Sequence, residues 1–136
     1  MIERTLIVLA LIVVAVVAFR LYTRYHLRRA AASATTDPLL QNLQPGVPAI
    51  VYFTLPTCVP CRTQQQPALA RLKDELGAGV QIVQIDASED AEAAERWGVF
   101  SAPTTFILDA CRQVREVNYG VADAQRLKRQ LEATGV

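Results

Sequence analysis

The stretch that decides the fold is Ala49-Ile-Val-Tyr-Phe-Thr-Leu-Pro-Thr-Cys-Val-Pro-Cys61, in which an apolar run leads into two cysteines separated by two residues. Residues 49–54 are a short apolar run with a proline at either side, which is typical of a buried strand. Residues 59–76 follow with a helical pattern that ends at a glycine. Cys58 and Cys61 therefore lie where a strand gives way to a helix.

The spacing of the two cysteines suits reversible disulfide chemistry. Cys58 lies at the start of the helix, where unpaired backbone N–H groups and the helix dipole favour the nucleophilic thiolate form. Cys61 lies one turn further on the same face, within the distance that a disulfide tolerates. A mixed disulfide on Cys58 can therefore be resolved by Cys61. Val59 and Pro60 complete the motif, and Pro60 stiffens the turn between the cysteines.

Strand and helix patterns alternate along the rest of the chain. The predicted elements are strands at 80–85, 104–108 and 113–119 and helices at 88–97 and 123–133. Ser88 and Asp123 are the expected N-caps of the two helices. The order β-α-β-α-β-β-α predicts one α/β sheet with helices packed on it.

Two prolines lie in positions that restrict the backbone. Pro67 falls within an otherwise helical stretch and is expected to bend it. Pro103, in the segment Ser101-Ala-Pro-Thr104, directly precedes a strand, where it cannot donate a hydrogen bond to the sheet. We expect a cis Ala102–Pro103 bond that leaves backbone groups beside the cysteines, where an extended substrate segment could pair with them.

Residues 46–136 resemble the thioredoxin family. The resemblance rests on five features in the same order, namely the strand at 50–53, Cys58-Val59-Pro60-Cys61, Pro67, the segment Gly98-Val-Phe-Ser-Ala-Pro-Thr104, and Gly120. It implies a thioredoxin-like fold with a central mixed β-sheet flanked by helices. It also implies thiol–disulfide exchange with protein disulfides or dithiols, supported by an external electron donor. By this resemblance Cys58 attacks the substrate, Cys61 resolves the mixed disulfide, and Ala102 and Pro103 contact the substrate.

The chain departs from thioredoxin itself near the cysteines. Thr57 stands where thioredoxin has a tryptophan, and Tyr52 stands where it has a buried acid. The lysine that accompanies this acid is assigned to Ile82. The buried Asp–Lys proton relay is therefore expected to be absent, so Cys61 would lose its proton to water, substrate or another base. Ala102 is smaller than the branched residue usual before the proline, which predicts a roomier substrate groove.

An apolar run near the N-terminus predicts a membrane-spanning helix that precedes the α/β domain. Residues 5–19 carry no charge, and Leu21 and Tyr22 extend the run past Arg20, whose side chain can reach the head groups. The extended run meets the lower limit of about 17 residues for a span. The alternative is a signal peptide that is cleaved among the small residues at 30–34.

The charges around this run predict its orientation. Four arginines lie at positions 20–29, whereas one acidic and one basic residue precede the run. Because basic flanks stay in the cytoplasm, we expect a single-pass protein of a bacterial-type plasma membrane with residues 31–136 on the cytoplasmic side. A periplasmic or extracellular domain is the alternative.

The expected organisation has three parts. Residues 1–29 form the transmembrane anchor with its basic flank, residues 30–45 a tether with a short helix, and residues 46–136 the thioredoxin-like domain. The short helix is expected to begin with Asp37 as N-cap and Pro38 at its first position. A composition of 51% hydrophobic and 20% charged residues excludes a disordered chain, and the net charge of +1 gives no basic footprint for nucleic acid.

Three cysteines, with the one histidine far from them in the sequence, cannot supply the four ligands of a structural zinc site within one chain. The sequence therefore implies no metal site of its own and no cofactor. Two alternatives remain for the cysteine pair. The domain is an adaptor whose cysteines share a metal ion with a partner, or it is a membrane-tethered redox sensor.

Several other side chains receive structural expectations. Cys111 lies in the predicted hairpin turn and is expected to be a surface thiol, with a regulatory or intermolecular disulfide as the alternative. The aromatic residues expected in the core are Phe53, Trp97, Phe100, Phe106 and Tyr119.

Overall fold

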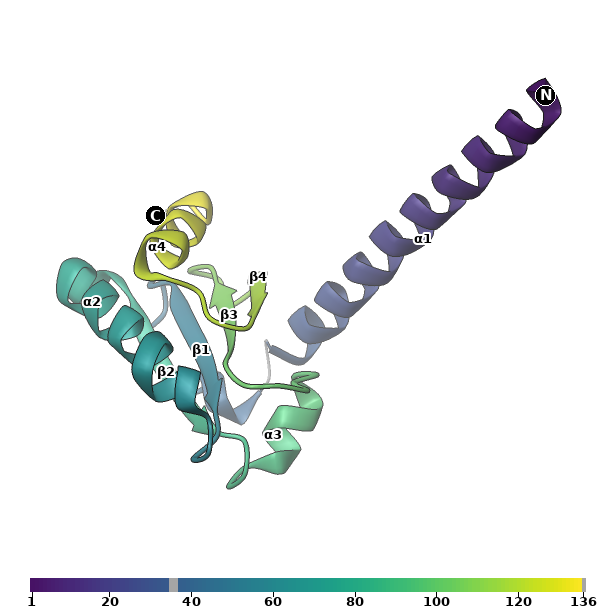
Figure 1. The fold of residues 1–136 in the computed structure, drawn as a ribbon. Coiled ribbons are helices and arrows are strands. Elements are labelled where there is room, and N and C mark those ends of the chain that lie inside the picture. The colour runs from purple at the N-terminus through teal and green to yellow at the C-terminus, as the bar shows by residue number, and fades with distance from the viewer. Residues whose placement is uncertain (35–36, 136) are drawn as a thin grey trace.

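The structure is a computed structural model that describes residues 1–34 and 37–135, with side chains described outside residues 26–34. A long N-terminal helix, α1 (Ile2–Ala34), projects away from an α/β domain (Figure 1). The part of α1 from Ile2 to Tyr25 is long and apolar enough to cross a membrane. A membrane span and a signal sequence both have these properties.

Two parts of the stretch from residue 30 to residue 45 are helical in the structure. Residues 30–34 belong to α1, because alanine, which fills most of these positions, has the highest helix propensity. Asp37 then caps a short 3₁₀ helix, η1 (Pro38–Leu40), as predicted, and its side chain accepts the N–H of Leu39 at 3.0 Å. Leu40 is buried against the domain.

The central sheet has four strands in the order β2-β1-β3-β4. The strands are β1 (Ala49–Thr54), β2 (Gln81–Asp86), β3 (Thr104–Leu108) and β4 (Val114–Tyr119). β1 pairs in parallel with β2 and antiparallel with β3, and β3 pairs antiparallel with β4, which confirms the predicted mixed sheet. Every residue of the two central strands is buried. The apolar run that precedes the cysteines is therefore the middle of the fold.

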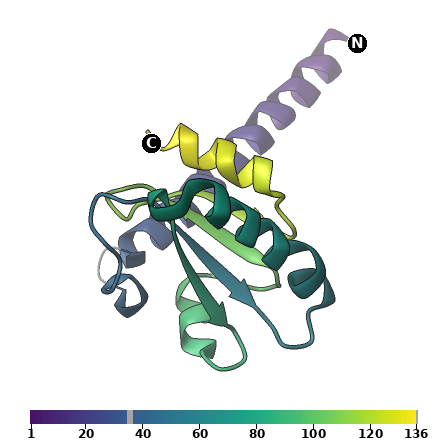
Figure 2. The same cartoon turned by 90° about the vertical axis from the view of Figure 1, so that its left-hand side faces the viewer.

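Helices cover both faces of the sheet. They are α2 (Gln66–Leu76), α3 (Ala91–Arg96) and α4 (Ala124–Ala133). α2 and α4 lie side by side on one face (Figure 2), where Cys61 is part of the core. α3 and η1 cover the other face, on which Phe53, Trp97 and Phe106 pack with ring centroids 5.0 to 6.1 Å apart. The predicted place of these three aromatic residues in the core is confirmed.

The helix predicted over residues 59–76 is present, but it changes its winding. After two helical residues comes one π-helical segment, η2 (Cys61–Gln65), in which the N–H of Gln66 donates to the carbonyl of Cys61. α2 begins after it and carries Pro67 in its first turn. Proline has no N–H to donate to the preceding turn, so it is accommodated where α2 starts anew.

The predicted N-cap of α3 is wrong. The N-cap of α3 is Asp90, which accepts the N–H of Ala93 at 3.0 Å, and not Ser88. The hydroxyl of Ser88 instead hydrogen-bonds to Asp86 at the end of β2, so it is not available to cap α3.

Two aromatic residues expected in the core are exposed. Phe100 is 89% exposed because it lies in the loop between α3 and β3. Tyr119 is 64% exposed, since it follows the buried Asn118 on β4 and side chains alternate along a strand.

Candidate active site

Cys58 and Cys61 are joined by a disulfide in the structure, and their Cα atoms are 5.3 Å apart. They lie between the end of β1 and the helical turn, at the junction that the sequence predicts. Cys58 is half-buried, whereas Cys61 is fully buried. A protein that approaches from solvent therefore meets the sulfur of Cys58 first.

The start of the helix provides a hydrogen-bond donor for the Cys58 sulfur. The backbone N–H of Cys61 donates to Sγ of Cys58 at 3.2 Å, and the N–H of Cys58 donates to the carbonyl of Leu55 at 3.1 Å. The residues after Cys58 are helical, so its sulfur lies at the positive end of the helix dipole. In the reduced protein this position stabilises a negative charge on Cys58.

The register of the sheet brings the proline segment to the disulfide. Phe53 on β1 pairs with Thr104 on β3, and the two strands run antiparallel. The chain therefore leaves β1 toward Cys58 at the same edge at which it enters β3 from Pro103. Val59, in the cysteine motif, is 56% exposed at this edge, and its neighbour Pro60 is exposed as well.

The Ala102–Pro103 peptide bond is cis, as expected. Ala102 and Cys58 both pack at the border of the same core cluster, on the α2 and α4 face of the sheet. Pro103 is buried, and its carbonyl accepts the N–H of Gly120 at 2.8 Å. The turn that contains Pro103 is thus held by the loop that follows β4.

A hollow of about 370 Å³ opens beside this region. It lies between the end of β1, α3 and the loop before β3, and its walls are largely apolar. The lining residues are Leu55, Ala87, Ala91, Ala94, Glu95, Val99, Phe100, Ser101 and Ala102. The sequence did not indicate this hollow, because its walls come from three separate segments and Phe100 was expected in the core.

Tyr52 lies fully buried behind the disulfide, with its hydroxyl 3.5 Å from the carbonyl oxygen of Cys61. Burial raises the pKa of the Tyr52 hydroxyl, and hydrogen bonds with Thr54 and Gln66 only partly oppose this rise. The sheet register pairs Tyr52 with Gln84.

Ile82, the position assigned to the family's lysine, lies two residues before Gln84 on β2 and packs against the core cluster that contains Tyr52. Since Gln84 and Ile82 are both uncharged, neither of these positions on β2 provides a basic partner for Tyr52.

Cys111 lies apart from the cysteine pair. It is an exposed free thiol in the turn between β3 and β4, at the opposite end of β3 from Pro103. Its backbone N–H donates to the carboxylate of Asp109 at 2.9 Å, so the main chain and not the thiol shapes this turn. Among the residues that the structure describes, no three His, Cys, Asp or Glu side chains are grouped so that they could hold a metal ion.

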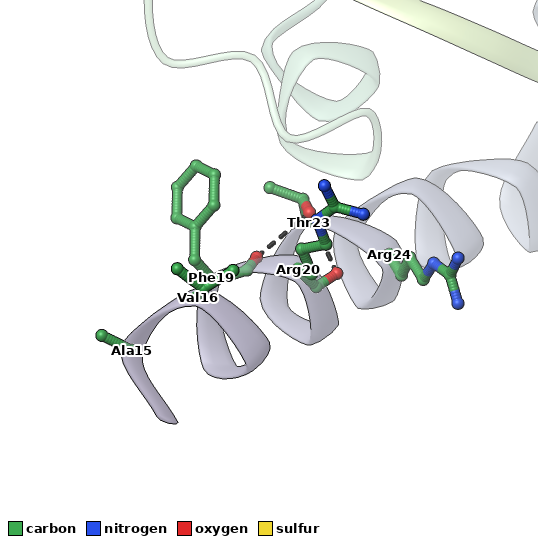
Figure 3. A pocket seen from close by; sticks show the side chains of 6 residues that line it. All are labelled: Ala15, Val16, Phe19, Arg20, Thr23 and Arg24. Atoms are coloured by element: carbon green, nitrogen blue, oxygen red, sulfur yellow. Dashed lines mark hydrogen bonds between the residues drawn. The ribbon is translucent and has the colours of Figure 1, made fainter. Parts of the chain in front are cut away.

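The apolar part of α1 gives way to basic residues along one side of the helix. Figure 3 shows a shallow hollow there, lined by Ala15, Val16, Phe19, Arg20, Thr23 and Arg24. The hydroxyl of Thr23 hydrogen-bonds to the carbonyls of Phe19 and Arg20. The side chains of His26, Arg28 and Arg29, which belong to the predicted basic flank, lie outside the described part of the chain.

The chain is similar to known proteins over its α/β domain. The family model described as Thioredoxin matches residues 32–133. Thioredoxin of Bacillus subtilis (strain 168) is 35% identical over 79 residues, which are 58% of this chain and 74% of that protein. NADPH-dependent thioredoxin reductase 3 of Arabidopsis thaliana is 34% identical over 84 residues. This match covers 62% of this chain but only 16% of the reductase.

A solved structure supports the fold independently. Thioredoxin-2, described as a component of the protein secretion machinery of the malaria parasite, superposes with a TM-score of 0.62 at 16% identity. The superposition covers 67% of this chain and 86% of that one. At this identity the likeness establishes the thioredoxin-like fold and nothing about partners.

Proposed function

The chain belongs to the thioredoxin family, and from this we propose that it exchanges electrons with protein disulfides through Cys58 and Cys61. The observation that carries the proposal is the disulfide itself. It joins a half-buried sulfur at a helix start to a buried sulfur one turn away. This arrangement suits one cysteine for attack and the other for resolution.

The exchange proceeds in two steps. The Cys58 thiolate attacks one sulfur of a substrate disulfide, so that a Cys58–substrate disulfide forms and the other substrate sulfur leaves as a thiolate. Cys61 then loses its proton and attacks Cys58, which closes the Cys58–Cys61 disulfide and releases the second substrate thiolate. The substrate gains two electrons and two protons. An external dithiol must return two electrons to the pair, and with a dithiol substrate all steps run in reverse.

Ala102 and Pro103 are proposed to contact the substrate beside the disulfide. The register of β1 and β3 supports this, because it brings both segments to one edge of the sheet. The hollow bounded by Leu55, Phe100 and Ala102 is largely apolar, and it can take an apolar side chain that neighbours the substrate disulfide.

We place the protein in a membrane as a single-pass protein. The exposed apolar side chains of α1 from Ile2 to Tyr25 support this proposal. Residues 1–29 then act as the anchor, 30–45 as the connection and 46–136 as the catalytic domain. The arginines after the apolar run favour a cytoplasmic domain that works as a reductase.

The test is dithiothreitol-driven reduction of insulin disulfides by the full chain in detergent. Cys58→Ala should abolish the reaction, because no thiolate remains to attack, whereas Cys111→Ala should keep most of it. An equal loss of activity in both variants would mean that Cys58 and Cys61 are not the active pair. Inactive wild-type protein that retains stoichiometric metal after dialysis would favour an adaptor with a shared metal ion instead.

A further inference from the structure

Gln65 is a fully buried polar residue that the proposed exchange does not use. It is the last residue of the π-helical segment η2 that begins at Cys61. Its side-chain Nε2 donates to the carbonyl of Ala122 at 3.0 Å, and its Oε1 accepts the N–H of Ala122 at 2.9 Å. One amide side chain thus satisfies both backbone groups of a residue that lies 57 positions further along the chain.

Ala122 belongs to the short loop between β4 and α4, and this loop holds the Pro103 turn. Gly120, two residues before Ala122, donates its N–H to the carbonyl of Pro103 at 2.8 Å. The cysteine segment and the Pro103 segment are therefore connected by two hydrogen-bonded links through residues 120–122. The other end of η2 is also fixed, since the carbonyl of Cys61 accepts the N–H of Gln66 and lies 3.5 Å from the Tyr52 hydroxyl.

We propose that Gln65 is a positioning residue that sets the distance between the cysteine pair and the Pro103 turn, and so determines how well an extended protein substrate fits between them. The proposal rests on the proposed function. Gln65 is too deep to touch the substrate itself, and it acts through Ala122 and Gly120. A buried amide with both hydrogen bonds made holds its partner in one place, because breaking either bond leaves an unsatisfied group.

The position of the Pro103 turn matters for some substrates only. A peptide that lies across both segments needs its backbone and its disulfide aligned at once, and a misplacement of about 1 Å can cost about 100-fold in rate. A small aromatic disulfide such as 5,5′-dithiobis(2-nitrobenzoate) needs the Cys58 sulfur alone. Replacement of Gln65 should therefore lower the activity with insulin more than the activity with the small disulfide.

The experiment compares Gln65→Leu with Gln64→Leu in the full chain. Gln64 is exposed, so its replacement is a matched control in the same helical segment. For each protein, kcat/KM is measured with insulin and with the small aromatic disulfide. We expect Gln65→Leu to lower the insulin-to-small-disulfide ratio by about tenfold, mostly through KM, and Gln64→Leu to leave it unchanged.

A second variant keeps the proposal testable if Gln65→Leu does not fold. In Gln65→Glu a protonated carboxyl can donate to the Ala122 carbonyl as the amide does, whereas a carboxylate cannot. We expect the ratio, taken relative to wild type at each pH, to recover as the pH falls from about 8 to about 5. Because a buried carboxylate also destabilises the fold and protonation relieves this, unfolding is measured at each pH and the ratio is compared only where the variant is fully folded.

The outcomes separate the two proposals. If wild-type protein reduces neither disulfide, the proposed function fails. If it reduces both while Gln65→Leu keeps the wild-type ratio, or while the folded Gln65→Glu variant keeps that ratio at every pH, the role of Gln65 is overturned and the proposed function stands.

Discussion

The indole Nε1 of Trp97 donates a hydrogen bond to the carboxylate of Asp37 at 2.9 Å. Asp37 also accepts hydrogen bonds from the guanidinium of Arg96 and the N–H of Leu39. A single buried carboxylate therefore ties the segment that follows α1 to the end of α3. This attachment lies on the opposite face of the sheet from Cys61, so it fixes the domain without obstructing the disulfide.

We predict that Asp37→Ala destabilises the domain by about 2 to 4 kcal/mol. The substitution leaves the buried Trp97 N–H without its acceptor, which costs about 1 to 3 kcal/mol, and it removes an N-cap worth about 1 kcal/mol. Asp123→Ala is the matched control, because Asp123 caps α4 from an exposed position, where it accepts the N–H of Arg126. Urea unfolding followed by fluorescence of Trp97, the single tryptophan, measures both. Equal losses in the two variants would contradict the role of Asp37.

The carboxylate of Asp37 also predicts how the stability of the domain depends on pH. Burial raises the pKa of Asp37, but hydrogen bonds from Arg96, Leu39 and Trp97 outweigh burial, so the net pKa is lowered. A carboxyl with a lower pKa in the folded state contributes stability above its unfolded value of about 3.9, and this contribution is lost as the pH falls through the folded value. We expect the unfolding free energy to decline below about pH 4, and less steeply in Asp37→Asn. A parallel decline in both proteins would assign the acid sensitivity elsewhere.

The sheet and its helices follow from local patterns, and for this reason they were predictable. Buried strands such as 49–54 and helix signals such as Asp123 each depend on a few neighbouring residues. Phe100 and Ser88 were misplaced because their surroundings depend on distant contacts. The exposure of Phe100 depends on how the loop after α3 packs, and the Asp86 carboxylate at the end of β2 engages Ser88. The hydrogen bonds between Gln65 and Ala122 likewise could not be predicted from the sequence, since the two positions lie far apart in the chain and no local pattern relates them.

The buried hydroxyl of Tyr52 at this position predicts that Cys61 loses its proton without the help of a buried base. Burial, the largest effect, raises the pKa of the Tyr52 hydroxyl, so the group remains protonated at neutral pH and cannot accept the Cys61 proton. We expect Tyr52→Phe to keep the shape of the pH profile for insulin reduction. Its rate should fall by much less than the factor of about 100 that is lost when a general base is removed. A lost ionisation in the pH profile of this variant would identify Tyr52 as a base after all.

The exposed ring of Phe100 is expected to contribute to substrate binding. Its ring is 89% exposed and borders the hollow beside Ala102, so an apolar substrate side chain can cover it. We expect Phe100→Ser to raise the KM for insulin about fivefold, which corresponds to about 1 kcal/mol of lost apolar contact. Stability should change by less than about 0.5 kcal/mol, as for other surface positions. Phe100→Tyr keeps the ring and should restore the KM, and a KM that is unchanged in Phe100→Ser would remove the hollow from the binding site.

The Cys61→Ser variant should trap the Cys58–substrate disulfide, which identifies both the attacking cysteine and the partner proteins. The variant can form the Cys58–substrate disulfide but cannot resolve it, because serine supplies no thiolate to attack Cys58. The exposed thiol of Cys111 is replaced by serine in all samples so that it forms no unrelated disulfides. We expect dithiothreitol-sensitive adducts with several proteins on non-reducing gels, and none when Cys58 is also replaced by serine. Adducts with only one protein would indicate a sensor with a dedicated partner, whereas adducts that persist without Cys58 would refute its role as the attacking residue.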